Sequence, residues 1–96
     1  MALQLLCRNL VRDYTDWRAI FDRDADAHRA AGLTLAAIWR DRQSAETVFF
    51  LFDVADFEKA NAFINAADAK AQAARSGVVE GSYHFLNSAP LYARGA

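Results

Sequence analysis

The chain has 96 residues, which is the length of one compact domain and leaves no room for a second. Hydrophobic residues make up 54% of it and aromatic residues 12%, with one proline and four glycines, a composition that excludes a largely disordered chain. The formal net charge is −1 and both signs are interspersed along the sequence, which argues against a nucleic-acid-binding surface.

Cysteine usage and hydropathy narrow the class of protein further. The single cysteine, Cys7, rules out an intrachain disulfide and a cysteine-rich metal site. No leader pattern opens the chain, and no apolar run approaches the ~20 residues that a membrane-spanning helix needs. We therefore expect a cytoplasmic protein without a membrane partner, folded as one domain over residues 1–96 with a core at about 3–88 and a tail at 89–96.

The first predicted elements are a strand and a helix. Leu3–Leu10 alternates between two faces as a strand does. Asp13 or Thr15 is placed to cap a helix, which we expect to run unbroken to about Ala31. Gly32 then favours the left-handed conformation that ends a helix.

A hairpin is predicted next. Leu33–Arg40 alternates as a second strand, Asp41–Ala45 is short and polar enough to form the turn, and Glu46–Val54 is the third strand. The third strand carries large apolar side chains on both of its faces. It therefore needs cover on both sides.

The last predicted elements are a helix and a strand. Asp56 is a suitable cap for a second helix, and a second capping signal indicates a break near Asn65. An alanine-rich continuation is expected over 66–75, followed by a strand at Ser82–Asn87. Pro90 indicates that the chain has by then left the sheet.

This order predicts an α+β, ferredoxin-like β-α-β-β-α-β fold, a four-stranded antiparallel sheet with both helices on one face. One sheet face is then left bare. Since an exposed apolar sheet of several hundred Å² would be a rough marker of an interface, we expect a homodimer formed through this face.

Five segments together resemble a known group of proteins. They are Val11–Asp22, Arg29–Gly32, Val48–Phe52, Asp56–Phe63 and Ser76–Val79. The chain resembles the dimeric α/β barrel superfamily, and more closely the small bacterial proteins near the antibiotic-biosynthesis-monooxygenase-like domains, many of them labelled as cyclases. The resemblance implies two protomers packed sheet to sheet, each with a cavity between its sheet and its helices, and speaks more strongly to fold than to chemistry.

Asp24 and His28 are the candidate catalytic residues. They lie one helical turn apart on the predicted apolar face of the first helix, where a polar pair needs a partner. The functional interpretation is a proton-transfer pair in which Asp24 orients His28. The structural interpretation, that both are simply hydrogen-bonded within the core, is favoured about two to one.

Five residues are candidates for ligand binding: Trp17, Trp39, Arg40, Tyr83 and His84. Tyr83 and His84 alternate on the last strand, so only one of them can face the cavity. Arg40 is placed to meet an anionic ligand or to pair with Glu46 or Asp53 across the hairpin. For each of these residues packing or surface pairing is the commoner role.

Several chemistries find no support in the sequence. Two histidines and Asp24 supply too few ligands for a metal site, no glycine-rich phosphate loop is present, and no serine lies in a nucleophile motif. No cofactor is predicted.

Three functions stay open at this stage. The resemblance implies a homodimer that binds an aromatic or polyketide-like small molecule and oxidises or cyclises it without a cofactor. The alternative is a ligand-binding or stress-associated dimer without catalysis. A haem-handling role would need His28 or His84 as the axial ligand.

Overall fold

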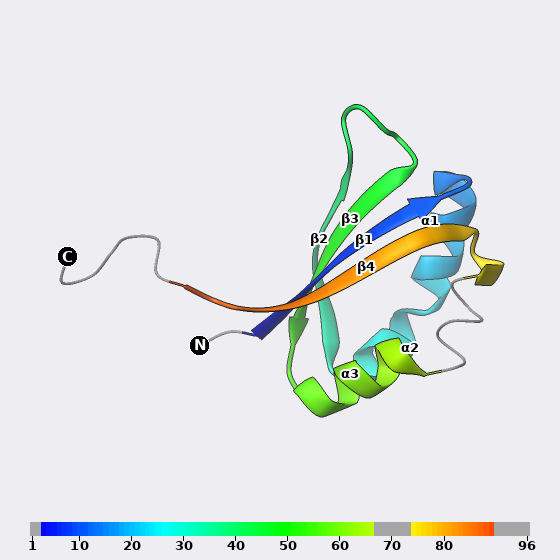
Figure 1. Cartoon of the computed structure of the whole chain (residues 1–96). Coiled ribbons are helices and arrows are strands. Elements are labelled where there is room, and N and C mark those ends of the chain that lie inside the picture. The colour runs from blue at the N-terminus through cyan, green and yellow to red at the C-terminus, as the bar shows by residue number, and fades with distance from the viewer. Residues whose placement is uncertain (1–2, 67–73, 90–96) are drawn as a thin grey trace, which may run out of the picture.

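The computed structural model describes residues 3–66 and 74–89 of the chain (Figure 1). Strands and helices follow one another in the predicted α+β order, except that the first helical region is divided in two. The elements are β1 Leu3–Val11, α1 Tyr14–Arg23, α2 Ala25–Ala30, β2 Leu33–Arg40, β3 Thr47–Val54, α3 Phe57–Asn65 and β4 Val78–Asn87. None of the helices in these residues is long and apolar enough to cross a membrane.

The sheet has the strand order β2-β3-β1-β4, and every neighbouring pair is antiparallel. Figure 1 shows all three helices on the same side of it. The predicted ferredoxin-like architecture is therefore confirmed. In the centre of the sheet, Cys7 of β1 lies opposite Phe50 of β3 on one side and Tyr83 of β4 on the other. The side chains of these three residues share the face that the helices cover.

Both predicted helix starts are capped as expected. The Asp13 carboxylate accepts a hydrogen bond from the backbone N–H of Asp16 at 3.0 Å, and Asp56 accepts one from Lys59 at 3.0 Å. Each bond satisfies an amide that the first turn of a helix leaves without an intrahelical partner. Gly32 adopts the predicted left-handed conformation, with a φ of 75°.

The prediction of one unbroken helix to Ala31 is wrong. Asp24 leaves the helical conformation with φ −87° and ψ 7°, so it ends α1 and begins α2. Its backbone N–H is shared between the carbonyls of Ile20 and Phe21, the bonding of a tightened last turn. Aspartate favours such sites because its side chain competes for backbone groups. The break interrupts the helical period, and Ala27, predicted to face inward, is exposed.

The last strand is longer than predicted. β4 begins at Val78 rather than Ser82, because Gly81 pairs within the ladder opposite Asn9 instead of lying in a loop. The break expected near Asn65 is present, since α3 ends there. The expected helical continuation lies mostly outside the described residues, and so does the tail from Pro90 onward.

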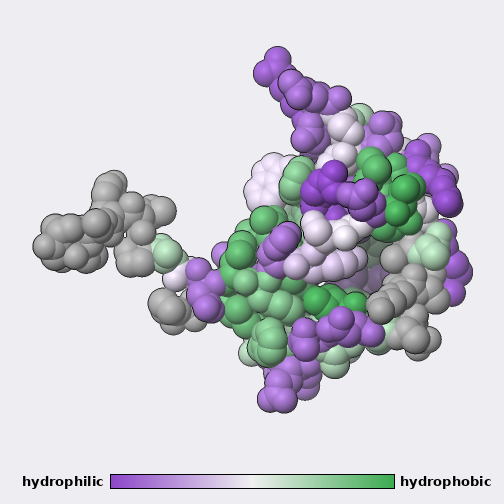
Figure 2. Space-filling view, in the orientation of Figure 1, coloured by the Kyte–Doolittle hydropathy of each residue, from purple (hydrophilic) through white to green (hydrophobic). Residues whose placement is uncertain are grey.

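The core is aromatic and lies between the sheet and the helices. Trp17 and Phe21 of α1 stack at 4.8 Å between ring centroids, and both contact Phe50 of β3, at 5.4 and 5.1 Å. Leu5, Cys7 and Val11 of β1 complete the floor beneath them. Figure 2 shows hydrophobic side chains gathered from the middle of β4 toward α3, whereas the β2–β3 turn is hydrophilic.

The opposite side of the sheet, the outer face, carries no described helix. Its apolar side chains are Leu6, Leu10, Trp39, Phe49, Leu51 and Leu86. Trp39 is 50% exposed and Leu86 42%. Polar groups share this face: Gln4 donates to Asp53 at 3.0 Å, Arg8 in the middle of β1 forms an ion pair with Glu80 at 3.2 Å, and His84 lies opposite Leu6. The bare apolar face predicted from the sequence is present.

Candidate functional site

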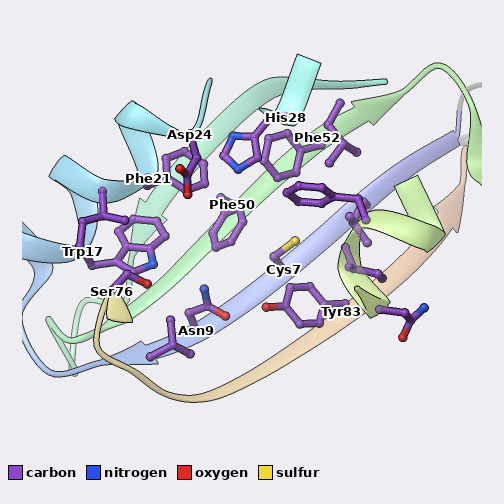
Figure 3. A pocket seen from close by; sticks show the side chains of 17 residues that line it. Cys7, Asn9, Trp17, Phe21, Asp24, His28, Phe50, Phe52, Ser76 and Tyr83 are labelled. Carbon is purple, nitrogen blue, oxygen red and sulfur yellow. The ribbon is translucent and has the colours of Figure 1, made fainter. Parts of the chain in front are cut away.

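A cavity of about 300 Å³ lies between the sheet and the helices (Figure 3). Its floor comes from the inward residues of β1, β3 and β4, and its walls come from α1, α2 and α3. The size is that of a small-molecule site.

Most of the lining is aromatic or aliphatic. Trp17, Phe21, Phe50 and Phe52 form one wall, with ring centroids of neighbouring pairs between 4.8 and 6.1 Å apart. Phe63 and Ile64 of α3 form the facing wall. Flat rings in offset and tilted arrangements bind a planar apolar molecule well, because each offers a large rigid surface.

His28 and Asp24 both line this cavity, as predicted. The imidazole ring of His28 packs against three phenylalanine rings, at 4.9 Å from Phe21, 5.2 Å from Phe52 and 5.7 Å from Phe63. Within residues 3–66 and 74–89, neither ring nitrogen has a hydrogen-bond partner. Asp24 therefore does not orient His28 through a side-chain bond in this structure, and the direct link between them is the backbone bond from the His28 N–H to the Asp24 carbonyl at 3.0 Å.

Burial among these rings lowers the pKa of His28 below its ordinary value of 6.5, and the negative charge of Asp24 offsets part of this effect. The ring is therefore neutral near pH 7. A neutral imidazole presents one free acceptor nitrogen and one N–H to whatever occupies the cavity. It is equipped to take a proton from a bound molecule.

The lowered pKa predicts a stability that depends on pH. Between the folded pKa of His28 and 6.5, the unfolded chain binds more protons, so the free energy of unfolding rises as pH rises through that interval. Urea denaturation at several pH values from about 5 to 7 measures the slope. His28→Gln should reduce this slope. An unaltered slope in His28→Gln would contradict the assignment.

The structure decides between Tyr83 and His84. Tyr83 lies opposite Cys7 on the inner face and lines the cavity, whereas His84 lies opposite Leu6 on the outer face. Tyr83 is 41% exposed because β4 is an edge strand, but its hydroxyl end points into the cavity (Figure 3). Burial, with a smaller electrostatic effect of Cys7, raises the pKa of Tyr83, so its hydroxyl stays protonated as a hydrogen-bond donor.

Trp39 and Arg40 lie away from the cavity. Trp39 is opposite Phe49 on the outer face. The Arg40 guanidinium lies 4.1 Å above the ring of Tyr14, and its Nε donates to the carbonyl of Ala45 at 3.0 Å. Arg40 thus stabilises the end of the hairpin against α1.

Solved structures with the same fold were found over nearly the whole chain. A candidate antibiotic biosynthesis monooxygenase from Bordetella bronchiseptica superposes with a TM-score of 0.74 and 16% identity, covering 93% of this chain and 98% of that one. SnoaB, a cofactor-independent oxygenase from Streptomyces nogalater, gives a TM-score of 0.71 at 12% identity, covering 93% and 94%. The chain has the fold of the antibiotic biosynthesis monooxygenase-like proteins.

The antibiotic biosynthesis monooxygenase-like fold is shared more widely. A NIPSNAP family protein from Agrobacterium tumefaciens has a TM-score of 0.66 at 10% identity, covering 95% of this chain and 96% of that one. No family model matches the sequence, and no curated protein matches it. At such low identities the comparisons establish the fold, and the chemistry has to be argued from the residues of the cavity.

Three polar residues of the cavity were not anticipated from the sequence as site residues, Asn9, Asn65 and Ser76. Asn9 could have been noticed, because it interrupts the apolar inner row of β1 formed by Leu5, Cys7 and Val11. Ser76 gives no such signal, since it precedes the turn at Gly77. Cys7 also lines the cavity, but burial raises its pKa to about 12, so the thiol is no nucleophile at neutral pH.

The described part of the chain contains no cluster of three or more His, Cys, Asp or Glu side chains with the spacing of a metal site. The polar side chains that line the cavity and can exchange a proton or a hydrogen bond with a ligand include those of His28, Asp24, Tyr83, Asn9, Asn65 and Ser76.

Proposed function

We propose that this protein is a homodimer that binds a flat aromatic or polyketide-like compound in each protomer and acts on it as a cofactor-independent monooxygenase. The observation that carries the proposal is the cavity of about 300 Å³, walled by aromatic rings and holding a neutral histidine. The fold shared with SnoaB, a cofactor-independent oxygenase, supports the same reaction class.

His28 takes the catalytic role in this proposal. Without a cofactor, the substrate itself supplies the electrons that reduce dioxygen, and a molecule that has lost a proton gives up electrons more readily. His28 accepts that proton, because its ring is neutral and is the titratable group packed most closely among the aromatic walls. The charge of Asp24 stabilises the imidazolium that forms. The oxidised carbon loses two hydrogens as its two C–H bonds break: one oxygen atom forms the C=O bond of the product, and the other leaves as water with both protons, including the one that His28 held.

The outer face supports the homodimer. Its apolar side chains run from Trp39 on β2 across Phe49 and Leu51 on β3 to Leu6 on β1, beside the ion pair of Arg8 and Glu80. An apolar sheet face of this kind is covered when it packs against the same face of a second copy. The sheet then serves both purposes, with the cavity on its inner face and the partner on its outer one.

Leu51→Lys tests the dimer. Leu51 lies at the centre of the outer face, opposite Leu6 and Ala37, and two lysines would be buried without partners in a symmetric interface. Burial of an unpaired charge costs about 3–5 kcal/mol, so the variant should sediment as a monomer where the parent is a dimer. Ala19→Lys, at an exposed position of α1, is the matched control and should stay dimeric. If the parent protein sediments as a folded monomer, the proposed homodimer is wrong.

The ligand is tested by mass spectrometry of the purified protein. Native spectra should show a bound small molecule that is released on denaturation, and its composition should be that of an aromatic compound. Dioxygen uptake by the protein with that compound then tests the oxygenase. A bound compound that is neither consumed nor altered would favour the alternative, a ligand-binding dimer without catalysis.

A further inference from the structure

His28 is held in the cavity by ring packing. Its imidazole has no hydrogen-bond partner among the described residues, and three phenylalanine rings pack against it. Figure 3 shows the imidazole beside the rings of Phe21 and Phe52. A base that accepts a proton has to be well placed, because a displacement of about 1 Å can cost about 100-fold in rate. The neighbouring rings therefore set the direction in which His28 points.

Two of the three rings belong to the core. Phe21 is 9% exposed and Phe52 is 3% exposed, and both also pack against Phe50. The core would hold these two rings in place with or without His28. They give the imidazole a fixed wall at 4.9 and 5.2 Å between ring centroids.

Phe63 is different, because its ring contact among the described residues is with His28. The centroids are 5.7 Å apart and the ring planes stand at 83°, which is a favourable edge-to-face arrangement. Phe63 is half-buried and comes from α3, which Figure 1 shows next to α2. Within α3 only Ala60 is fully buried, so Phe63 covers His28 from outside the central core.

The charges around this contact are few. Asp24 is the charged group that acts on His28, and it favours the protonated ring. Cys7 and Tyr83 stay protonated and uncharged, because burial raises the pKa of each. The nearby charged residues of the three helices are exposed and lie outside the cavity lining: Asp22, Arg23, Asp26, Arg29, Glu58 and Lys59. Apolar cover is thus the main influence on the proton affinity of His28.

We propose that Phe63 is a positioning residue for His28: its ring fixes the direction of the imidazole and keeps water from the nitrogen that accepts the substrate's proton. Phe21 and Phe52 are fixed by the core, so α3 is the element whose position decides how well His28 is covered. The inference deepens the proposed function. Its catalytic part rests on that function, whereas the cover of His28 by Phe63 does not.

Titration of the His28 ring by NMR tests the cover without any substrate. His84→Gln removes the second of the two histidines, so the remaining imidazole signals belong to His28. In this background Phe63→Ala should move the pKa of His28 upward toward 6.5, because water reaches the ring. Phe63→Gln, with a good helix former, should do the same if the alanine variant unfolds. Phe63→Leu should keep the pKa low, because leucine replaces most of the apolar cover.

Phe57→Ala is the matched control. Phe57 lies on the same helix and also offers a ring, but that ring meets Phe85 of β4. Its loss should leave the pKa of His28 at the parent value. An unchanged pKa in both Phe63→Ala and Phe63→Gln would overturn the proposal. An equal rise in Phe57→Ala would also overturn it, because a loosened helix would then explain the effect.

The pH dependence of kcat tests the role of Phe63 in the reaction. Phe63→Ala should lower kcat about tenfold and move the acidic limb of the profile to higher pH, in step with the NMR titration. If Phe63→Ala only lowers the stability and leaves the limb in place, Phe63 is not a positioning residue. If the parent consumes no dioxygen, the proposed function is wrong, and the NMR titration still decides whether Phe63 covers His28.

Discussion

Replacement of His28 by alanine is expected to lower turnover of the bound compound about 100-fold, the lower limit of what a positioned general base contributes. The reason is that His28 is the neutral base packed among the aromatic walls, within one turn of Asp24. Dioxygen consumption under saturating substrate measures kcat directly. The affinity for the compound should change much less, because the imidazole is a small part of the wall.

His84→Ala is the control for this experiment. The second histidine of the chain lies on the outer face, opposite Leu6, and should retain at least half of the parent activity. Full activity in His28→Ala would remove this residue from the mechanism. Asp24→Asn should have an intermediate effect, since it removes the charge that stabilises the protonated ring and leaves the base in place.

Phe50→Ala is expected to lower the free energy of unfolding by about 3–5 kcal/mol, the range for truncating a buried phenylalanine. Phe50 is 5% exposed at the centre of β3, and its ring contacts Trp17, Phe21 and Phe52. The substitution removes all three of these ring contacts and leaves a cavity that the rigid sheet cannot close. Because small domains have only about 5–15 kcal/mol in total, this loss is a large share of the stability and should lower the urea midpoint of the variant well below that of the parent.

Phe57→Ala is the matched control for Phe50. Phe57 is 47% exposed in the first turn of α3, where its ring meets Phe85 at 4.8 Å between centroids. Its loss should cost about 1 kcal/mol. Denaturation in urea, followed by circular dichroism, compares the two variants on one scale. A similar loss in both would show that the packing around Phe50 is not the centre of the core.

Much of the fold could be predicted from local pattern. The alternation in Leu3–Leu10, the caps at Asp13 and Asp56 and the glycine at position 32 each act over a few residues, and each is confirmed. The strict alternation predicted for Leu33–Arg40 is wrong, because the register shifts between Leu35 and Ala37 and moves the later residues to the opposite faces. The break at Asp24 was missed because the apolar period continues through it and only the backbone bonds reveal the interruption.

Part of the cavity could also be predicted. Trp17, Asp24 and His28 fall on one helical face, and that face does line the cavity. The sequence could not decide between Tyr83 and His84. Alternation along a strand places the two residues on opposite faces of the sheet, but it does not show which face the helices cover. Trp39 shows a related limit, because strict alternation would place it on the face of Leu33 and Leu35. The register shift between Leu35 and Ala37 puts it on the outer face instead.

The sequence by itself determined the order of strands and helical regions, the helix starts at Asp13 and Asp56 and the presence of two apolar sheet faces, because these follow from interactions between residues close together in the chain. Only the tertiary structure decided which face receives the helices, and which residues meet across the ladder. Asn9 and Gly81 are far apart in the chain and become neighbours through the register of β1 on β4. That register is set by the packing of the whole sheet, and so is the cavity that opens above it.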